Sequence, residues 1–166
     1  MIYKFDILFK KSLKSGGLKV VTYSSLLENP EEFGKGEGFA DAEGELSMVL
    51  EGPEEGFSIN ALYRKYRAQL VGKVNADMLG KDFSLLFVFA KANDPYSIKM
   101  ALRTEDGNVI EIETDAFELM LAKDSDCTIT CAETQVKLQR GQAVFTTIPA
   151  TQLTIEPAGA NLIRVI

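Results

Sequence analysis

Carboxylates at alternate positions are the first residues of this chain that suggest chemistry. Asp41, Glu43 and Glu45 alternate along one segment, and Asp124 and Asp126 alternate along another. Side chains two apart on an extended strand point to the same face, so each set could present its oxygens together. Such oxygens could bind Ca²⁺, and paired carboxylates can hydrolyse glycosides. No EF-hand loop accompanies them, so we expect solvated carboxylates, with neither a metal nor a cofactor.

The absence of histidine from the 166 residues limits the catalytic chemistry that is available. It removes the usual general base near neutral pH and the Ser/His and Cys/His nucleophile pairs. The glycine-rich segment 34–38 matches neither a dinucleotide fingerprint nor a Walker loop, and the acidic residues around it would repel phosphate. We therefore expect a protein that is not an enzyme. A carboxylate enzyme that acts on carbohydrate is the catalytic alternative.

The two cysteines, Cys127 and Cys131, lie four residues apart in a β-branched segment that favours a strand. Residues four apart on a strand lie about 13 Å apart, which is too far for a disulfide. We expect two small buried residues. The alternative is a thiol pair open to oxidation or to an intermolecular bond.

The densest cluster of basic and aromatic residues is Tyr63, Arg64, Lys65 and Arg67. The apolar residues of 58–74 recur at helical spacing, which predicts an amphipathic helix that Ser58 or Asn60 could cap. The simplest interpretation is a solvated basic face on a helix that packs on a sheet. Because Tyr and Arg dominate protein–protein contacts, our functional hypothesis is that these four residues bind an acidic partner.

Charge is blocked along the chain, whose formal net charge is -6. Residues 1–27 carry +4, 28–56 carry -9, 57–76 carry +4 and 77–166 carry -5. Blocks of opposite sign could lie side by side in the fold, or the acidic block could bind a cation or a basic partner. The overall acidity argues against binding of nucleic acid or of anionic membranes.

The elements that must position these residues are mainly strands. Residues 1–11 alternate as a half-buried strand, with Tyr3, Phe5, Ile7 and Phe9 on one face. The turn that follows predicts a hairpin with a returning strand over 18–26. We expect a loop over 28–44 and another strand over 45–51, with Leu46, Met48 and Leu50 pointing inward.

The pattern of the rest of the chain predicts short strands separated by turns. Asp106–Gly107 is a strong hairpin signal between the predicted strands 96–103 and 109–113. Many short strands at regular spacing indicate a sandwich or barrel. We predict a single mainly β domain over 1–166. It would be an antiparallel β-sandwich or partly closed barrel, with at most one substantial helix near residues 58–74.

A binding or assembly module of unknown ligand is the function that these observations favour. We expect protein–protein contacts, including self-association into a homo-oligomer through edge strands such as 1–11 or 162–166. A small β-barrel that binds an apolar ligand is the alternative of another class. The first residues lack an apolar signal segment and no apolar run is long enough to cross a bilayer, so we expect a cytoplasmic protein.

Overall fold

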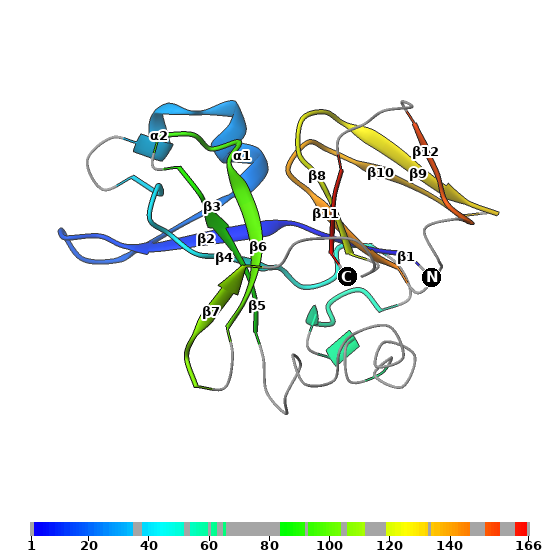
Figure 1. Ribbon diagram of the computed structural model, residues 1–166, viewed down its shortest axis with the longest axis horizontal. Coiled ribbons are helices and arrows are strands. Elements are labelled where there is room, and N and C mark those ends of the chain that lie inside the picture. The colour runs from blue at the N-terminus through cyan, green and yellow to red at the C-terminus, as the bar shows by residue number, and fades with distance from the viewer. Residues whose placement is uncertain are drawn as a thin grey trace.

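The computed structural model is mainly β, and its described strands form three antiparallel sheets (Figure 1). The structure describes residues 2–34, 38–51, 54–59, 61–62, 65, 84–91, 93–103, 106–111, 119–132, 134–146, 152–156 and 162–165. None of the sheets formed by these residues closes into a barrel. The prediction of a mainly β, antiparallel sandwich-like fold is therefore confirmed.

The six-stranded sheet is the largest and holds most of the first half of the chain. In spatial order it contains β3 (Leu18–Thr22), β2 (Ile7–Ser12), β4 (Gly44–Leu46), β5 (Ser84–Phe89), β6 (Ile98–Arg103) and β7 (Val109–Glu111).

The two smaller sheets hold the second half of the chain together with the first strand. The four-stranded sheet has the order β1 (Ile2–Phe5), β11 (Ala143–Thr146), β8 (Leu119–Ala122) and β13 (Leu162–Val165). The three-stranded sheet has the order β10 (Thr134–Leu138), β9 (Cys127–Cys131) and β12 (Thr154–Glu156).

The four-stranded sheet lies between the other two and is buried on both faces. Alternate side chains of β8 and β11 enter different hydrophobic clusters. Leu121 and Phe145 join the cluster shared with the six-stranded sheet. Met120 and Val144 join the cluster shared with the three-stranded sheet. All four residues of each strand are buried, and the result is a three-layered stack of sheets.

Strands β1 and β2 are one extended segment that passes from the four-stranded sheet to the six-stranded sheet at Asp6. The Asp6 N–H donates to Ser47 Oγ at 3.0 Å, and the Ser47 N–H donates to the Asp6 carbonyl at 2.9 Å. Gln142 Nε2 donates to the Asp6 carboxylate at 2.9 Å. These bonds satisfy the polar groups of the junction, where neither ladder continues.

The predicted inward face of the first strand is confirmed. Tyr3, Phe5, Ile7 and Phe9 are all fully buried in the first cluster. The cysteines follow the prediction in part: both thiols are free and Cys127 is buried, whereas Cys131 is only partly buried.

Two short helices replace the end of the predicted returning strand and the start of the predicted loop. The helix α1 spans Tyr23–Glu28 and α2 spans Glu31–Gly34. Thr22 ends the strand as the N-cap of α1, since its hydroxyl accepts from the Ser25 N–H at 3.1 Å. Tyr23 and Leu26 are then fully buried on the helix face that packs in the first cluster.

The predicted strand over 45–51 is also shorter than expected. It ends at Leu46, because Ser47 turns to bond to Asp6. Beyond Leu46 the side chains no longer alternate between the core and the solvent as predicted. Met48 is 62% exposed, and Val49 is buried in its place.

Only part of the predicted helix near residues 58–74 lies within the described residues. Within that part, Ile59, Leu62 and Lys65 have helical conformation. The Ala61 N–H donates to Ser58 Oγ at 3.1 Å, which confirms Ser58 as a capping residue. Leu62 is fully buried and Lys65 is exposed, as an amphipathic helix requires.

Candidate functional site

The predicted partner-binding cluster falls largely outside the described residues. Tyr63, Arg64 and Arg67 belong to that part of the chain, so their hypothesis stays a prediction. Lys65 is described and exposed, and its ammonium pairs with the carboxylate of Glu54. Glu54 is only 7% exposed, and its second carboxylate oxygen has no hydrogen-bond partner.

The alternating carboxylates of the acidic segment pair with three different bases. Lys11 Nζ lies 2.9 Å from Asp41 Oδ1. Glu45 pairs with Lys10. Glu43 pairs with Arg103 in the same way. The hydrogen bond from Lys11 lowers the pKa of the Asp41 carboxyl below its ordinary value.

The charge blocks therefore lie side by side within one chain. Two further pairs, Lys4–Glu51 at 3.2 Å and Lys19–Glu32 at 3.3 Å, also join the basic first block to the acidic second block. Within the described ranges, no group of three or more His, Cys, Asp or Glu side chains is arranged to hold a metal ion.

The predicted edge strands are confirmed only in part. β1 and β13 do end the four-stranded sheet, but β2, the second half of the predicted edge 1–11, is interior to the six-stranded sheet. β1 is also partly covered, since the Leu50 N–H donates to the Lys4 carbonyl at 2.9 Å. The outer strands of the six-stranded sheet are β3 and β7.

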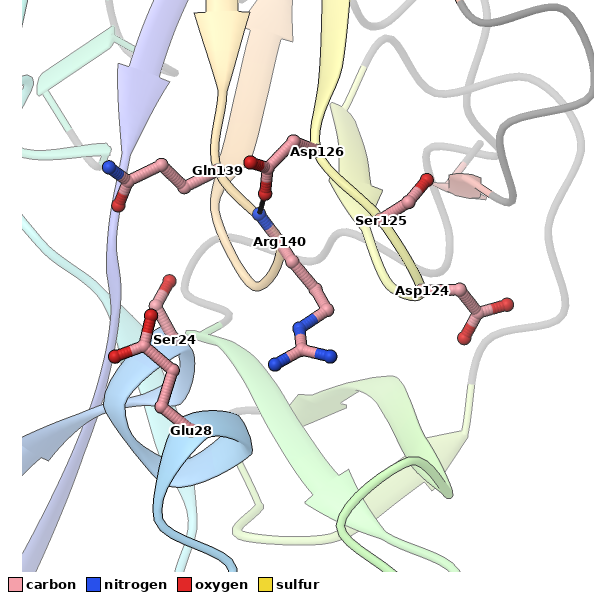
Figure 2. A pocket seen from close by; sticks show the side chains of 7 residues that line it. All are labelled: Ser24, Glu28, Asp124, Ser125, Asp126, Gln139 and Arg140. Carbon is pink, nitrogen blue, oxygen red and sulfur yellow. Dashed lines mark hydrogen bonds between the residues drawn. The ribbon is translucent and has the colours of Figure 1, made fainter.

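A polar pocket lies where α1 meets the two turns that connect the smaller sheets (Figure 2). One turn follows β8 and the other precedes β11, so both carry the chain between the four-stranded and three-stranded sheets. The pocket has a volume of about 280 Å³. The described residues that line it are all polar or charged: Ser24, Glu28, Asp124, Ser125, Asp126, Gln139 and Arg140.

Backbone contacts fix the turn that carries Arg140. The Arg140 N–H donates to Asp126 Oδ1 at 2.7 Å and joins the two turns. Gly141 has a φ of +94°, and its N–H donates to the Ala122 carbonyl at 2.6 Å. A Cβ at Gly141 would lie 2.8 Å from Ser24 N, so only glycine lets the turn approach α1 this closely.

The electrostatics of the pocket are mixed. Glu28, Asp124 and Asp126 contribute carboxylates, whereas Arg140 contributes one guanidinium. Two of these charges, those of Asp124 and Arg140, act on the buried phenol of Tyr23. Burial raises the pKa of the Tyr23 phenol well above its ordinary value, Asp124 adds to this rise, and Arg140 opposes it.

The sequence indicated only part of this pocket. Asp124 and Asp126 form an alternating pair in the sequence, but Arg140, Glu28 and Ser24 come from a turn or from a helix that the pattern does not predict. The Gln139–Gln142 turn between two apolar strands was the available signal for Arg140.

Comparison with protein-family models, curated proteins and solved structures finds no match to this chain. No helix within the described residues has the length and apolar character needed to cross a membrane.

Proposed function

We propose that this chain is a non-catalytic assembly module whose copies associate by pairing β3 of one molecule with β3 of another. The observation that carries the proposal is an open strand edge with exposed apolar side chains. Leu18 is 59% exposed and Val20 is 49% exposed on this edge. An edge strand is a template for pairing with a further strand.

The backbone of β3 supports this pairing. The Leu13 N–H donates to the Gly17 carbonyl at 3.1 Å, and bonded and non-bonded pairs alternate along an antiparallel ladder. By this alternation, Leu18 and Val20 direct their N–H and C=O groups away from β2. Within the described residues, no backbone hydrogen bond joins these outward groups to another segment.

The side chains of β3 are compatible with a two-fold axis through Val20. Antiparallel pairing about this residue places Leu18 opposite Thr22 of the second copy and Lys19 opposite Val21 of the second copy. Lysines of the two strands then do not oppose each other, and the exposed apolar residues form one stripe.

The charge of the β2–β3 hairpin does not oppose this association. Its lysines include Lys10, Lys11 and Lys19, and each of them already pairs with a carboxylate of the acidic segment. Two copies of this hairpin therefore approach as nearly neutralised surfaces, with little of the repulsion that free ammonium groups would exert.

Sedimentation and light scattering across protein concentration test the proposal. The edge is short, so we expect a monomer–dimer equilibrium that becomes visible between micromolar and about 1 mM protein. Val20→Lys places like charges opposite each other across the two-fold axis. It should weaken dimerisation about tenfold or more. The new lysine also lies opposite Lys10 of β2, so we expect a small fall in thermal midpoint, as for a lysine at position 109, which would lie opposite Arg103.

Val109→Lys is the matched control. Val109 is a 45% exposed valine on β7, the other edge of the same sheet, and its substitution should leave the dimer intact. A wild-type chain that stays monomeric throughout this range would overturn the proposal. So would a dimer that Val20→Lys and Val109→Lys weaken equally.

A further inference from the structure

We propose that the pocket between α1 and the two turns binds a small zwitterion, a free α-amino acid, with its carboxylate on Arg140 and its ammonium group facing Glu28. The site is separate from the β3 edge and does not depend on self-association. Four observations support this assignment: the composition of the lining, a guanidinium and an opposing carboxylate that are both unpaired among the described residues, and the fixed backbone of the turn that carries Arg140.

The lining selects for a polar ligand. The pocket of about 280 Å³ lies near the lower end of the range for small-molecule sites, which is the size suited to a metabolite of a few heavy atoms. All of its lining residues carry hydrogen-bonding or charged side chains. An apolar ligand would leave these groups without partners and would bind poorly.

Arg140 supplies the anion-binding half of the site. Among the described residues, its guanidinium makes no hydrogen bond or ion pair, although the side chain is partly buried. Figure 2 shows it extending between Glu28 and Asp124. A planar guanidinium with free donors matches a carboxylate in a bidentate pair.

Glu28 supplies the cation-binding half from the opposite wall. Its carboxylate lies on α1, whereas Arg140 lies on the β10–β11 turn. The Glu28 carboxylate likewise makes no hydrogen bond or ion pair with any described residue. An ammonium group placed between the walls would meet this carboxylate.

The balance of charge argues against ligands with a single kind of charge. Three carboxylates and one guanidinium give the lining a formal excess of negative charge, so a simple anion would be repelled. A simple cation would meet the guanidinium in the middle of the pocket. A zwitterion satisfies both groups at once.

The backbone of the turn that carries Arg140 is held in place before any ligand binds. The Arg140 N–H is bonded to Asp126, the next residue is the tightly packed Gly141, and the Gln139 N–H donates to Gln142 Oε1 at 2.9 Å. A turn fixed in this way loses little conformational entropy on binding, which favours the affinity for a small ligand.

NMR titration with L-glutamine tests the assignment, using the backbone amides of Ser125 and Gly141 as reporters. We expect saturable shifts of both amides in the wild-type chain. Arg140→Gln and Glu28→Gln should each weaken binding about tenfold or more, because each removes one half of the charge recognition. N-acetyl-L-glutamine and L-glutamine amide, which each lack one charge, should bind at least as poorly.

Lys137→Gln and Glu31→Gln are matched controls, since they remove the same charges as the pocket variants from exposed residues that are not among the described lining residues. Both should bind L-glutamine as the wild type does. The assignment is overturned if L-glutamine causes no shifts at these amides, or if either blocked derivative binds as tightly. It is also overturned if the control variants lose binding as much as the pocket variants.

Discussion

Tyr23 is a residue whose pKa is affected both by burial and by neighbouring charges. Its ring lies in the core, 6.1 Å from the ring of Phe9 between centroids, and its hydroxyl donates to the Pro95 carbonyl at 2.8 Å. This bond satisfies the one polar atom of a fully buried side chain. Burial, with smaller effects from Tyr96 and Asp124, raises the pKa of the phenol.

Stability should therefore depend on this phenol at alkaline pH. The pKa of the phenol is higher in the folded chain than the unfolded value of about 10. Its contribution is thus complete below about pH 10 and falls as pH rises above that value, by at most about 1.4 kcal/mol per pH unit. Urea unfolding at pH 8 and pH 11 measures this loss.

Tyr23→Phe separates the phenol from the other tyrosines. At pH 8 the variant should be about 1 kcal/mol less stable, because the bond to Pro95 is lost. Between pH 8 and pH 11 it should lose less stability than the wild type. An equal loss in both proteins would contradict the assignment of the alkaline dependence to Tyr23.

At the scale of elements, a substitution at Gly141 tests how tightly the β10–β11 turn is packed on α1. Gly17 has a similar positive φ of +87°, but a Cβ there would meet no atom within 4 Å. Gly17→Ala should cost about 1–2 kcal/mol from backbone strain alone. Gly141→Ala should cost clearly more in the same unfolding experiment, because its Cβ would overlap the backbone of Ser24. Equal costs would show that the turn can shift away from α1.

The sequence predicts the strands and helices well where the signal is local. The prediction fails where a tertiary contact decides the conformation. The first strand, the Asp106–Gly107 hairpin and the Ser58 cap follow from alternation, turn chemistry and capping. The prediction of a strand through Met48 is wrong, because the hydrogen bond of Ser47 to Asp6 ends the strand and shifts the alternation of buried and exposed side chains. The pattern does not predict the helix α1, because its apolar residues also fit a strand.

For the whole molecule, we expect the shared central sheet to make the three sheets unfold as one unit, which the prediction of a single domain requires. Tyrosine fluorescence reports the first core through Tyr3 and Tyr23, and the Cys127 thiol reports the second. In a Cys131→Ser background, both probes should give the same urea midpoint.

Substitutions on opposite faces of β8 sharpen this test. Leu121→Ala removes packing from the first core and Met120→Ala from the second, each at a cost of about 2–5 kcal/mol. Either substitution should lower the midpoint seen by both probes. If each lowers only the midpoint of its own core, the two cores unfold independently.

The arrangement of the layers could be predicted only in outline. Strand number and charge blocking indicated a sandwich with neighbouring opposite charges, and the ion pairs within the chain agree with that interpretation. The pairing of β1 with β11 had no local signal, since it joins residues at distant positions. The pocket depends on that pairing and on α1, so its residues could not be grouped from the sequence.

The passage of one segment through Asp6 also sets an order of events during synthesis. Ile2 pairs with Thr146 in the four-stranded sheet, whereas Leu8 pairs with Thr22 in the six-stranded sheet. The ribosome therefore releases one half of this segment long before its partner strand exists. The hairpin of Leu8 can form early, but the strand of Ile2 must wait for β11. Until then, β1 is an unpaired apolar strand for which a nascent-chain chaperone could compete.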